Sequence, residues 1–136
     1  MSKKNKLDPV LVYSVMKQES GFRLDAGSPV GASGLMQVMP DHFTKPAKKT
    51  DKGAYYSKMF GSYRVKTKDY YNRFDPYINV TYGTGILAKC LKDAGGNRKK
   101  ALSLYNSGSI TGFLRFDETK GYVNNIIAHV NKLKGA

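Results

Sequence analysis

Acidic side chains are scarce in this 136-residue chain, and glutamate is the scarcest of them. The chain holds 10 Asp and Glu against 23 Lys and Arg, a formal charge of +13, and its two glutamates are Glu19 and Glu118. Such an excess of positive charge indicates a polyanionic partner, because it raises both the encounter rate and the nonspecific affinity for anions. Nucleic acid, an anionic membrane and an anionic cell wall all satisfy this condition.

Cysteine is also scarce, and long apolar runs are missing. The single cysteine, Cys90, excludes an internal disulfide and offers no metal-site spacing, so we interpret it as a small buried apolar residue. No segment approaches the roughly 18 apolar residues of a membrane-spanning helix. The basic start runs into Asp8 and Pro9 without a small-residue cleavage site, so it does not resemble a signal peptide. We expect no metal, no cofactor and no membrane span.

The remaining composition is that of one globular domain. A chain of 136 residues is long enough to bury one core. Its 40% hydrophobic and 12% aromatic content argues against disorder. We expect residues 1–136 to form a single monomeric domain, with a basic tail at 1–7.

Capping residues and apolar periodicity predict four helices and a mainly α fold. The first helix should begin at Asp8, with Pro9 in the first helical position, and end at Gly21. The second should end at the glycine pair 95–96 and the third at 107–108. The starts of the second, third and fourth helices are predicted at Asp75, Asn97 and Asp117.

The segment 41–73 differs in character from the rest of the chain. It contains nine Lys or Arg, three Asp and five tyrosines, and no clear period runs through it. We interpret it as a long irregular excursion, with a short helix or hairpin around Tyr55–Phe60 or Tyr63–Lys66. A connection of this length in a compact domain is either functional or mobile.

Glu19 is the candidate catalytic acid. It follows Val12, Val15 and Met16 on one helical stripe, so its carboxyl group should lie partly against apolar surface. Desolvation disfavours the ionised form and raises the pKa, which suits a general acid that works near neutral pH. Periodicity alone equally allows a surface glutamate at a frayed helix end.

Five motifs follow Glu19 along the chain in a fixed order. They are Glu-Ser-Gly-Phe at 19–22, Ser-Pro-Val-Gly-Ala-Ser-Gly-Leu-Met-Gln-Val-Met-Pro at 28–40, Asp75-Pro76 with Asn79 and Gly83, Ala-Leu-Ser-Leu-Tyr-Asn-Ser-Gly at 101–108, and Glu118-Thr119 with Tyr122-Val123. Together they resemble the soluble lytic transglycosylases, catalytic domains related in fold to goose-type lysozyme. The resemblance covers about residues 8–133. The chain departs from the family pattern at Leu104, where alanine is usual, and in the longer, more basic segment 41–73.

The resemblance implies a lysozyme-like fold with a substrate groove, and cleavage of peptidoglycan. Glu19 would protonate the oxygen that bridges N-acetylmuramic acid and N-acetylglucosamine. The same carboxylate would then take a proton from the C6 hydroxyl of the muramic acid, which attacks C1 and closes a 1,6-anhydro ring; an intramolecular hydroxyl has a high effective concentration. The residues implied in substrate binding are Ser33, Met36, Gln37, Tyr105, Asn106 and Tyr122, the last also orienting Glu19.

Two alternative functions stay open. A goose-type-lysozyme-like hydrolase would use a water molecule held by Asp25 or Asp41. A remote alternative is a basic nucleic-acid-binding module in which tyrosines of 41–73 stack on bases, although no recognised nucleic-acid motif is present.

Other titratable residues receive non-catalytic interpretations. We interpret Glu118 as a favourable charge in the first turn of a helix. His42 and His129 are expected to be surface or capping residues, because no acid or serine lies at a suggestive spacing from either.

The expected partners are peptidoglycan strands, with anionic wall polymers as a further partner and no specific nucleic acid. The protein would therefore act on the bacterial cell wall. Without a recognisable signal peptide, it suits a phage lysin or a virion-associated enzyme. It suits equally a domain trimmed from a larger tail, conjugation or secretion protein.

Overall fold

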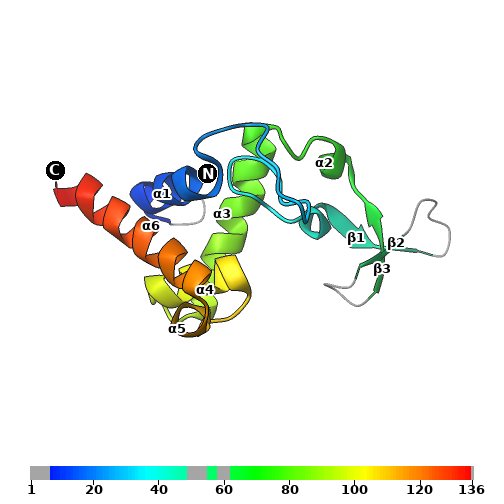
Figure 1. Ribbon diagram of the computed structural model, residues 1–136. Coiled ribbons are helices and arrows are strands. Elements are labelled where there is room, and N and C mark those ends of the chain that lie inside the picture. Colours follow the sequence, from blue (N-terminus) through cyan, green and yellow to red (C-terminus); the bar gives the residue numbers. More distant parts are fainter. Residues whose placement is uncertain (1–6, 49–54, 58–61, 136) are drawn as a thin grey trace.

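A computed structural model describes residues 7–48, 55–57 and 62–135 of the chain. In Figure 1 the long helix α3 crosses the middle of the molecule, with α1, α4, α5 and α6 on one side and a small sheet on the other. The elements in chain order are α1 (Pro9–Ser20), the 3₁₀ helix η1 (Pro40–Phe43), β1 (Thr44–Pro46), β2 (Tyr55–Ser57), β3 (Ser62–Lys66), α2 (Lys68–Tyr71), α3 (Pro76–Asp93), α4 (Arg98–Ser107), α5 (Gly112–Arg115) and α6 (Asp117–Gly135). The predicted mainly α class is confirmed.

Local capping explains where α1 begins and ends. The Asp8 carboxylate accepts a hydrogen bond from the Val10 amide at 2.9 Å, and Gly21 ends the helix in the left-handed region with φ of 60°. Asp8 also pairs with Arg98 and Lys134, which hold the pKa of its carboxyl group well below its usual value. The predicted bounds of the first helix are confirmed, and its start is tied by charge to α4 and α6.

The other predicted helix starts are confirmed with one adjustment. Asp75 caps α3 by accepting from the Ile78 amide, and Asn97 caps α4 by accepting from the Lys100 amide. Asp117 is not the cap of the last helix, because it already lies in the first turn of α6. The short helix α5 has no counterpart in the sequence prediction, since its four residues are too few to show a period.

Segment 41–73 is more regular than predicted. The hairpin expected near Tyr63–Lys66 exists as β2 and β3, while residues 58–60 of the other expected location, Tyr55–Phe60, lie outside the described part of the chain. β1 was not predicted; it completes an antiparallel sheet of order β1-β3-β2, with Thr44 opposite Lys66. The sheet lies at the end of the molecule opposite the C-terminus (Figure 1). Its pairing joins residues far apart in sequence, which a local pattern does not reveal.

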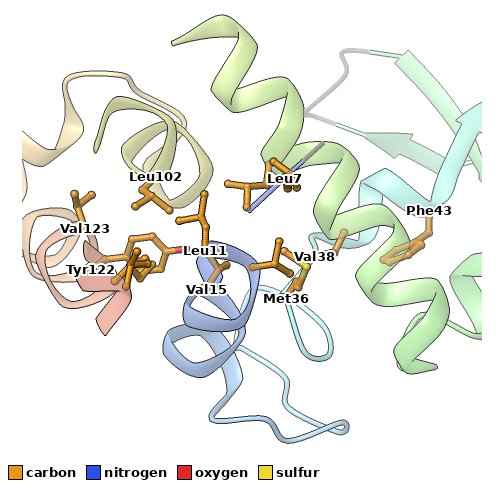
Figure 2. Close-up of a cluster of buried hydrophobic side chains, with 13 residues drawn as sticks. Leu7, Leu11, Val15, Met36, Val38, Phe43, Leu102, Tyr122 and Val123 are labelled. Atoms are coloured by element: carbon orange, nitrogen blue, oxygen red, sulfur yellow. The ribbon is translucent and has the colours of Figure 1, made fainter. Parts of the chain in front are cut away.

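One hydrophobic core joins the helices beside the sheet. Figure 2 shows Leu11 and Val15 of α1 facing Leu102 of α4 and Tyr122 of α6. Leu7 belongs to this core with 7% of its surface exposed, so the predicted basic tail ends before it. The interpretation of Cys90 is confirmed: the residue is buried, and burial raises the pKa of its thiol to about 11.

The described residues contain neither a membrane-spanning helix nor a metal-binding cluster. Within 7–48, 55–57 and 62–135, no helix is both long and apolar enough to cross a bilayer. Nor does this part of the chain contain a group of three or more His, Cys, Asp or Glu that could hold a metal ion.

Two glycines of α3 allow a matched test of the packing. A Cβ atom added to Gly83 would lie 2.6 Å from the Cβ atom of Met36, whereas one added to Gly85 meets nothing within 4 Å. Because alanine favours a helix, we expect Gly85→Ala to raise the free energy of unfolding by about 0.5–1 kcal/mol. Gly83→Ala should lower it by about 1–3 kcal/mol through overpacking. Urea unfolding of both variants checks this, and equal effects would contradict the close approach of α3 to Met36.

Candidate active site

Glu19 lies in the last turn of α1, where the helix meets the loop that follows it. Its side chain is half-buried, and the Tyr122 hydroxyl of α6 donates a hydrogen bond of 2.7 Å to its Oε2 atom. The neighbouring Ser20 hydroxyl lies 2.8 Å from the Leu35 carbonyl oxygen and donates to it, which fixes this end of α1 against the loop. Tyr122 belongs to the hydrophobic core, as does Val15 one turn earlier on α1. Glu19 therefore lies at the edge of apolar surface, as expected.

Burial sets the protonation of the Glu19 carboxyl group. Desolvation raises its pKa to about 7, and the hydrogen bond from Tyr122 opposes that rise in part because it stabilises the carboxylate. In turn, burial and the nearby Glu19 charge raise the pKa values of Tyr105 and Tyr122 well above the ordinary value for tyrosine. Both phenols therefore remain protonated donors over the physiological pH range.

The loop 26–38 forms one wall of the site, and Asn79 of α3 holds it in place. The Asn79 side chain is fully buried; its Oδ1 accepts from the Met36 amide at 2.8 Å, and its Nδ2 donates to the Ser33 carbonyl at 2.7 Å. Gly34 has φ of 75°, and a Cβ atom there would lie 2.7 Å from Asn79 Cγ. The motif asparagine and glycine therefore act together, because only glycine allows this approach.

Gln37 adopts a backbone conformation that is uncommon for a residue with a side chain. Its φ is 49°, and its side-chain amide donates to the carbonyl oxygens of Ala26 and Gly34, each at 3.0 Å. Non-glycine residues in the left-handed region cost roughly 1–2 kcal/mol, so the surrounding hydrogen bonds must hold this one there. The strained residue lies on the wall of the cleft beside Glu19.

The cleft at Glu19 has a volume of about 260 Å³. It is lined by Glu19, Ser28, Val30, Ala32, Gln37, Met39, Tyr105, Asn106 and Glu118. A second cavity of about 370 Å³ shares Met39, Tyr105 and Asn106 with it and extends to Lys89 and Asp93 of α3. The two cavities share these three lining residues and are therefore neighbours; we call them together the groove.

Three predicted binding residues do lie around the cleft. Gln37 comes from the loop, while Tyr105 and Asn106 come from the end of α4. The Tyr105 hydroxyl donates to the Met36 carbonyl at 2.7 Å, and Asn106 Oδ1 accepts from the Thr119 hydroxyl at 2.9 Å. These bonds orient both α4 side chains before any ligand binds.

Ser33 and Met36 lie beneath the cleft and do not line it. Ser33 is 2% exposed; its hydroxyl donates to the Gly31 carbonyl and accepts from the Arg73 guanidinium at 3.1 Å. Met36 is fully buried against Gly83. Both shape the floor indirectly, by holding the loop, so direct contact with a sugar has no support in this geometry.

Glu118 is a cleft residue that the sequence interpretation missed. It does lie in the first turn of α6, as predicted, yet it also lines the same cavity as Glu19. Asp25, by contrast, is exposed beside Arg23, and Asp41 belongs to η1. In the described part of the chain, neither of these aspartates lines the Glu19 cleft.

The two histidines lie away from Glu19. His42 is half-buried and lines the outer part of the groove with Lys89, where burial lowers its pKa. His129 of α6 lies 2.8 Å through its Nδ1 atom from the hydroxyl of the buried Ser14, and its ring stacks on Tyr13. This arrangement links α6 to α1.

Comparison with known proteins gives a consistent result. Residues 1–120 match the family model described as "Transglycosylase SLT domain". The soluble lytic murein transglycosylases of Escherichia coli K12 and Salmonella typhimurium are 29% and 30% identical over 134 and 136 residues. Each of these alignments covers 85% of this chain and 19% of the relative. The chain therefore spans about a fifth of the length of these relatives.

Solved structures agree with the sequence matches. An inactive mutant of the lytic transglycosylase Slt from Pseudomonas aeruginosa superposes with a TM-score of 0.71 at 26% identity, covering 95% of this chain and 22% of that one. The 70-kDa soluble lytic transglycosylase of Escherichia coli gives a TM-score of 0.68 at 27% identity, with the same coverage. The expected lysozyme-like fold is confirmed.

The buried acid predicts how stability depends on pH. The folded state, with the pKa of Glu19 raised to about 7, keeps a proton that the unfolded chain releases above about 4.3. The folded state therefore binds more protons in this window, and its free energy of unfolding falls as pH rises through it. Glu19→Gln lacks this loss. We therefore expect its free energy of unfolding, relative to that of the wild type, to rise by about 1–3 kcal/mol between pH 4.5 and pH 8. Denaturant unfolding at both pH values measures the difference; a pH-independent difference would contradict the raised pKa.

Proposed function

Since the chain belongs to the transglycosylase SLT domain family, we propose that it is a peptidoglycan lytic transglycosylase. It cleaves the β-1,4 bond between N-acetylmuramic acid and N-acetylglucosamine and leaves a 1,6-anhydro-muramic acid end. The observation that carries this proposal is the carboxyl group of Glu19, which faces the cleft and has a pKa of about 7. Near neutral pH a substantial fraction of such a group is protonated, as the acid step requires, and the carboxylate that this step leaves can then act as the base.

In the first step Glu19 acts as the acid. Its proton goes to the bridging oxygen, the C1–O bond breaks, and the N-acetylglucosamine side leaves as an alcohol. Tyr122 engages Oε2, so we assign the proton transfer to Oε1. The hydrogen bond from Tyr122 also stabilises the carboxylate that the transfer produces, because bonds to ionised acceptors are the stronger ones.

In the second step the same carboxylate acts as the base. It takes the proton of the C6 hydroxyl as that oxygen bonds to C1, which closes the anhydro ring and returns Glu19 to its acid form. Attack by a hydroxyl of the same sugar benefits from a high effective concentration and consumes no water. Tyr105 and Asn106, already oriented by their bonds to Met36 and Thr119, supply polar atoms for the hydroxyl and N-acetyl groups.

The proposed setting is the bacterial cell wall, with the domain as a monomer on peptidoglycan strands. The charge of +13 favours the approach to a wall that carries carboxylates or phosphodiester polymers. A phage-lysin or virion-associated role, or a role within a larger protein, stays a prediction.

Product analysis tests the reaction. Digestion of purified wall should yield muropeptides that end in 1,6-anhydro-muramic acid, and Glu19→Gln should lower the rate at least about a thousandfold, because removal of a general acid that also acts as base removes both steps. Glu118→Gln is the matched control: it makes the same chemical change in the same cleft and should keep the anhydro product. Mass spectrometry separates the outcomes, and products with a reducing end would identify a hydrolase.

Tyr122→Phe tests the positioning role of the hydroxyl group. Loss of the donor destabilises the Glu19 carboxylate, so we expect the alkaline limb of the pH–rate profile to move upward by about one unit. The rate at the optimum should fall about tenfold, since the carboxyl group loses its orientation. If Tyr122 only filled the core, its replacement by phenylalanine would leave the pH–rate profile unchanged. An unmoved alkaline limb would therefore refute the positioning role of the hydroxyl group.

A further inference from the structure

A patch of aromatic and basic side chains lies outside the cleft, where β3, α2 and the start of α3 meet. Its exposed members are Lys66, Lys68, Tyr71 and Phe74. Tyr70 and Arg73 support them from a half-buried position. We call these six residues the aromatic–cationic strip. All but Phe74 belong to segment 41–73, whose excess of Lys and Arg the cleft chemistry does not use.

Ring contacts join five of the six residues of the strip, and Lys68 lies on the same short helix α2 as Tyr70 and Tyr71. The Lys66 Nζ atom and the Arg73 Cζ atom each lie 4.5 Å from the centroid of the Tyr70 ring. Tyr71 packs edge-on against Tyr70 at 5.4 Å, and Arg73 also lies 5.1 Å from the Phe74 ring. Cations that already lie over aromatic faces lose little further side-chain freedom when a ligand binds.

The strip is positive on balance, because its three cations, Lys66, Lys68 and Arg73, outnumber the two neighbouring carboxylates. The nearby Asp69 carboxylate accepts a 2.6 Å hydrogen bond from the Tyr82 hydroxyl of α3, and Asp75 caps that helix. Both carboxylates are thus engaged by α3. Lys66 and Lys68 remain exposed beside Tyr71, whose surface is 72% exposed.

The strip is rigidly joined to the wall of the cleft. The Arg73 guanidinium donates to the Ser33 hydroxyl, and the Asn79 amide donates to both the Arg73 and Ser33 carbonyl oxygens, at 3.0 and 2.7 Å. Ser33 lies in the loop 26–38 that carries Gln37 into the cleft. A polymer bound on the strip would therefore be held in a fixed relation to Glu19.

We infer that the aromatic–cationic strip is a second binding surface for peptidoglycan, outside the cleft that holds Glu19. This inference rests on the proposed function. Peptidoglycan has groups that bind both kinds of side chain. The apolar faces of its sugar rings can pack on Tyr71 and Phe74. The carboxylates of its stem peptides can pair with Lys66 and Lys68. A phosphodiester polymer without sugar rings would use the lysines alone.

Binding to insoluble wall tests the strip without any turnover. In a Glu19→Gln background, the variant Lys66→Gln/Lys68→Gln and the variant Tyr71→Ala should each bind purified, phosphodiester-free peptidoglycan about tenfold more weakly, a loss of about 1.4 kcal/mol. The first variant removes charges that pair with carboxylates, and the second removes a ring that packs on sugar faces. The lysine variant should also bind with a weaker dependence on salt. Lys99→Gln/Lys100→Gln, which removes two exposed lysines from α4, is the matched control and should bind as the parent does.

The outcomes separate this inference from the proposed function. Equal binding by the strip variants and the α4 control would overturn the strip. Strip-dependent binding seen only with DNA, or only with walls that still carry phosphodiester polymers, would overturn its assignment to peptidoglycan. Thermal unfolding confirms that each variant is folded. The wild-type enzyme is assayed separately on short soluble glycans, so that a failure of the proposed cleavage shows there and leaves the binding result intact.

Discussion

The hydrogen bond between Tyr122 and Glu19 is the contact on which the site depends. It joins the last turn of α1 to the first half of α6 across 103 positions of sequence, and it lies at the edge of the hydrophobic core. A buried carboxyl group without a partner costs several kcal/mol. Here the phenol satisfies one oxygen, and protonation near neutral pH removes the remaining cost. Burial and the hydrogen bond from Tyr122 together therefore keep Glu19 compatible with the fold and set its pKa in the range of a general acid.

A second constraint shapes the cleft from the opposite side. Asn79 is fully buried, and its side chain binds the backbone of Ser33, Met36 and Arg73, so one residue fixes the loop and the strip together. Gly34 and Gln37 accept left-handed backbone conformations within that loop. The strain at Gln37 is offset by its two amide bonds to loop carbonyls. The cleft wall is therefore formed before substrate arrives, which favours catalysis by reducing what must be reorganised.

Helix boundaries could be predicted because their causes are local: Asp8, Asp75 and Asn97 each cap a helix within three residues. Glu19 could be predicted because its stripe has a helical period and its motif is specific. What could not be predicted depends on packing between distant segments. Ser33 and Met36 belong to a binding motif but face inward toward Arg73 and Gly83, and Glu118 reaches the cleft from the start of α6. Strand β1 pairs with β3 through non-local hydrogen bonds, which no local period records.

The scarcity of glutamate makes the pKa of Glu19 directly measurable. In a chain with two glutamates, selective ¹³C labelling of the glutamate carboxyl carbons gives two NMR signals, and Glu118→Gln assigns them. We expect the carboxyl carbon of Glu19 to titrate with a pKa of about 7 in the folded protein. Titration near the ordinary value of about 4.3 would contradict it, because Glu19 would then be almost fully ionised at neutral pH and could not act as the acid.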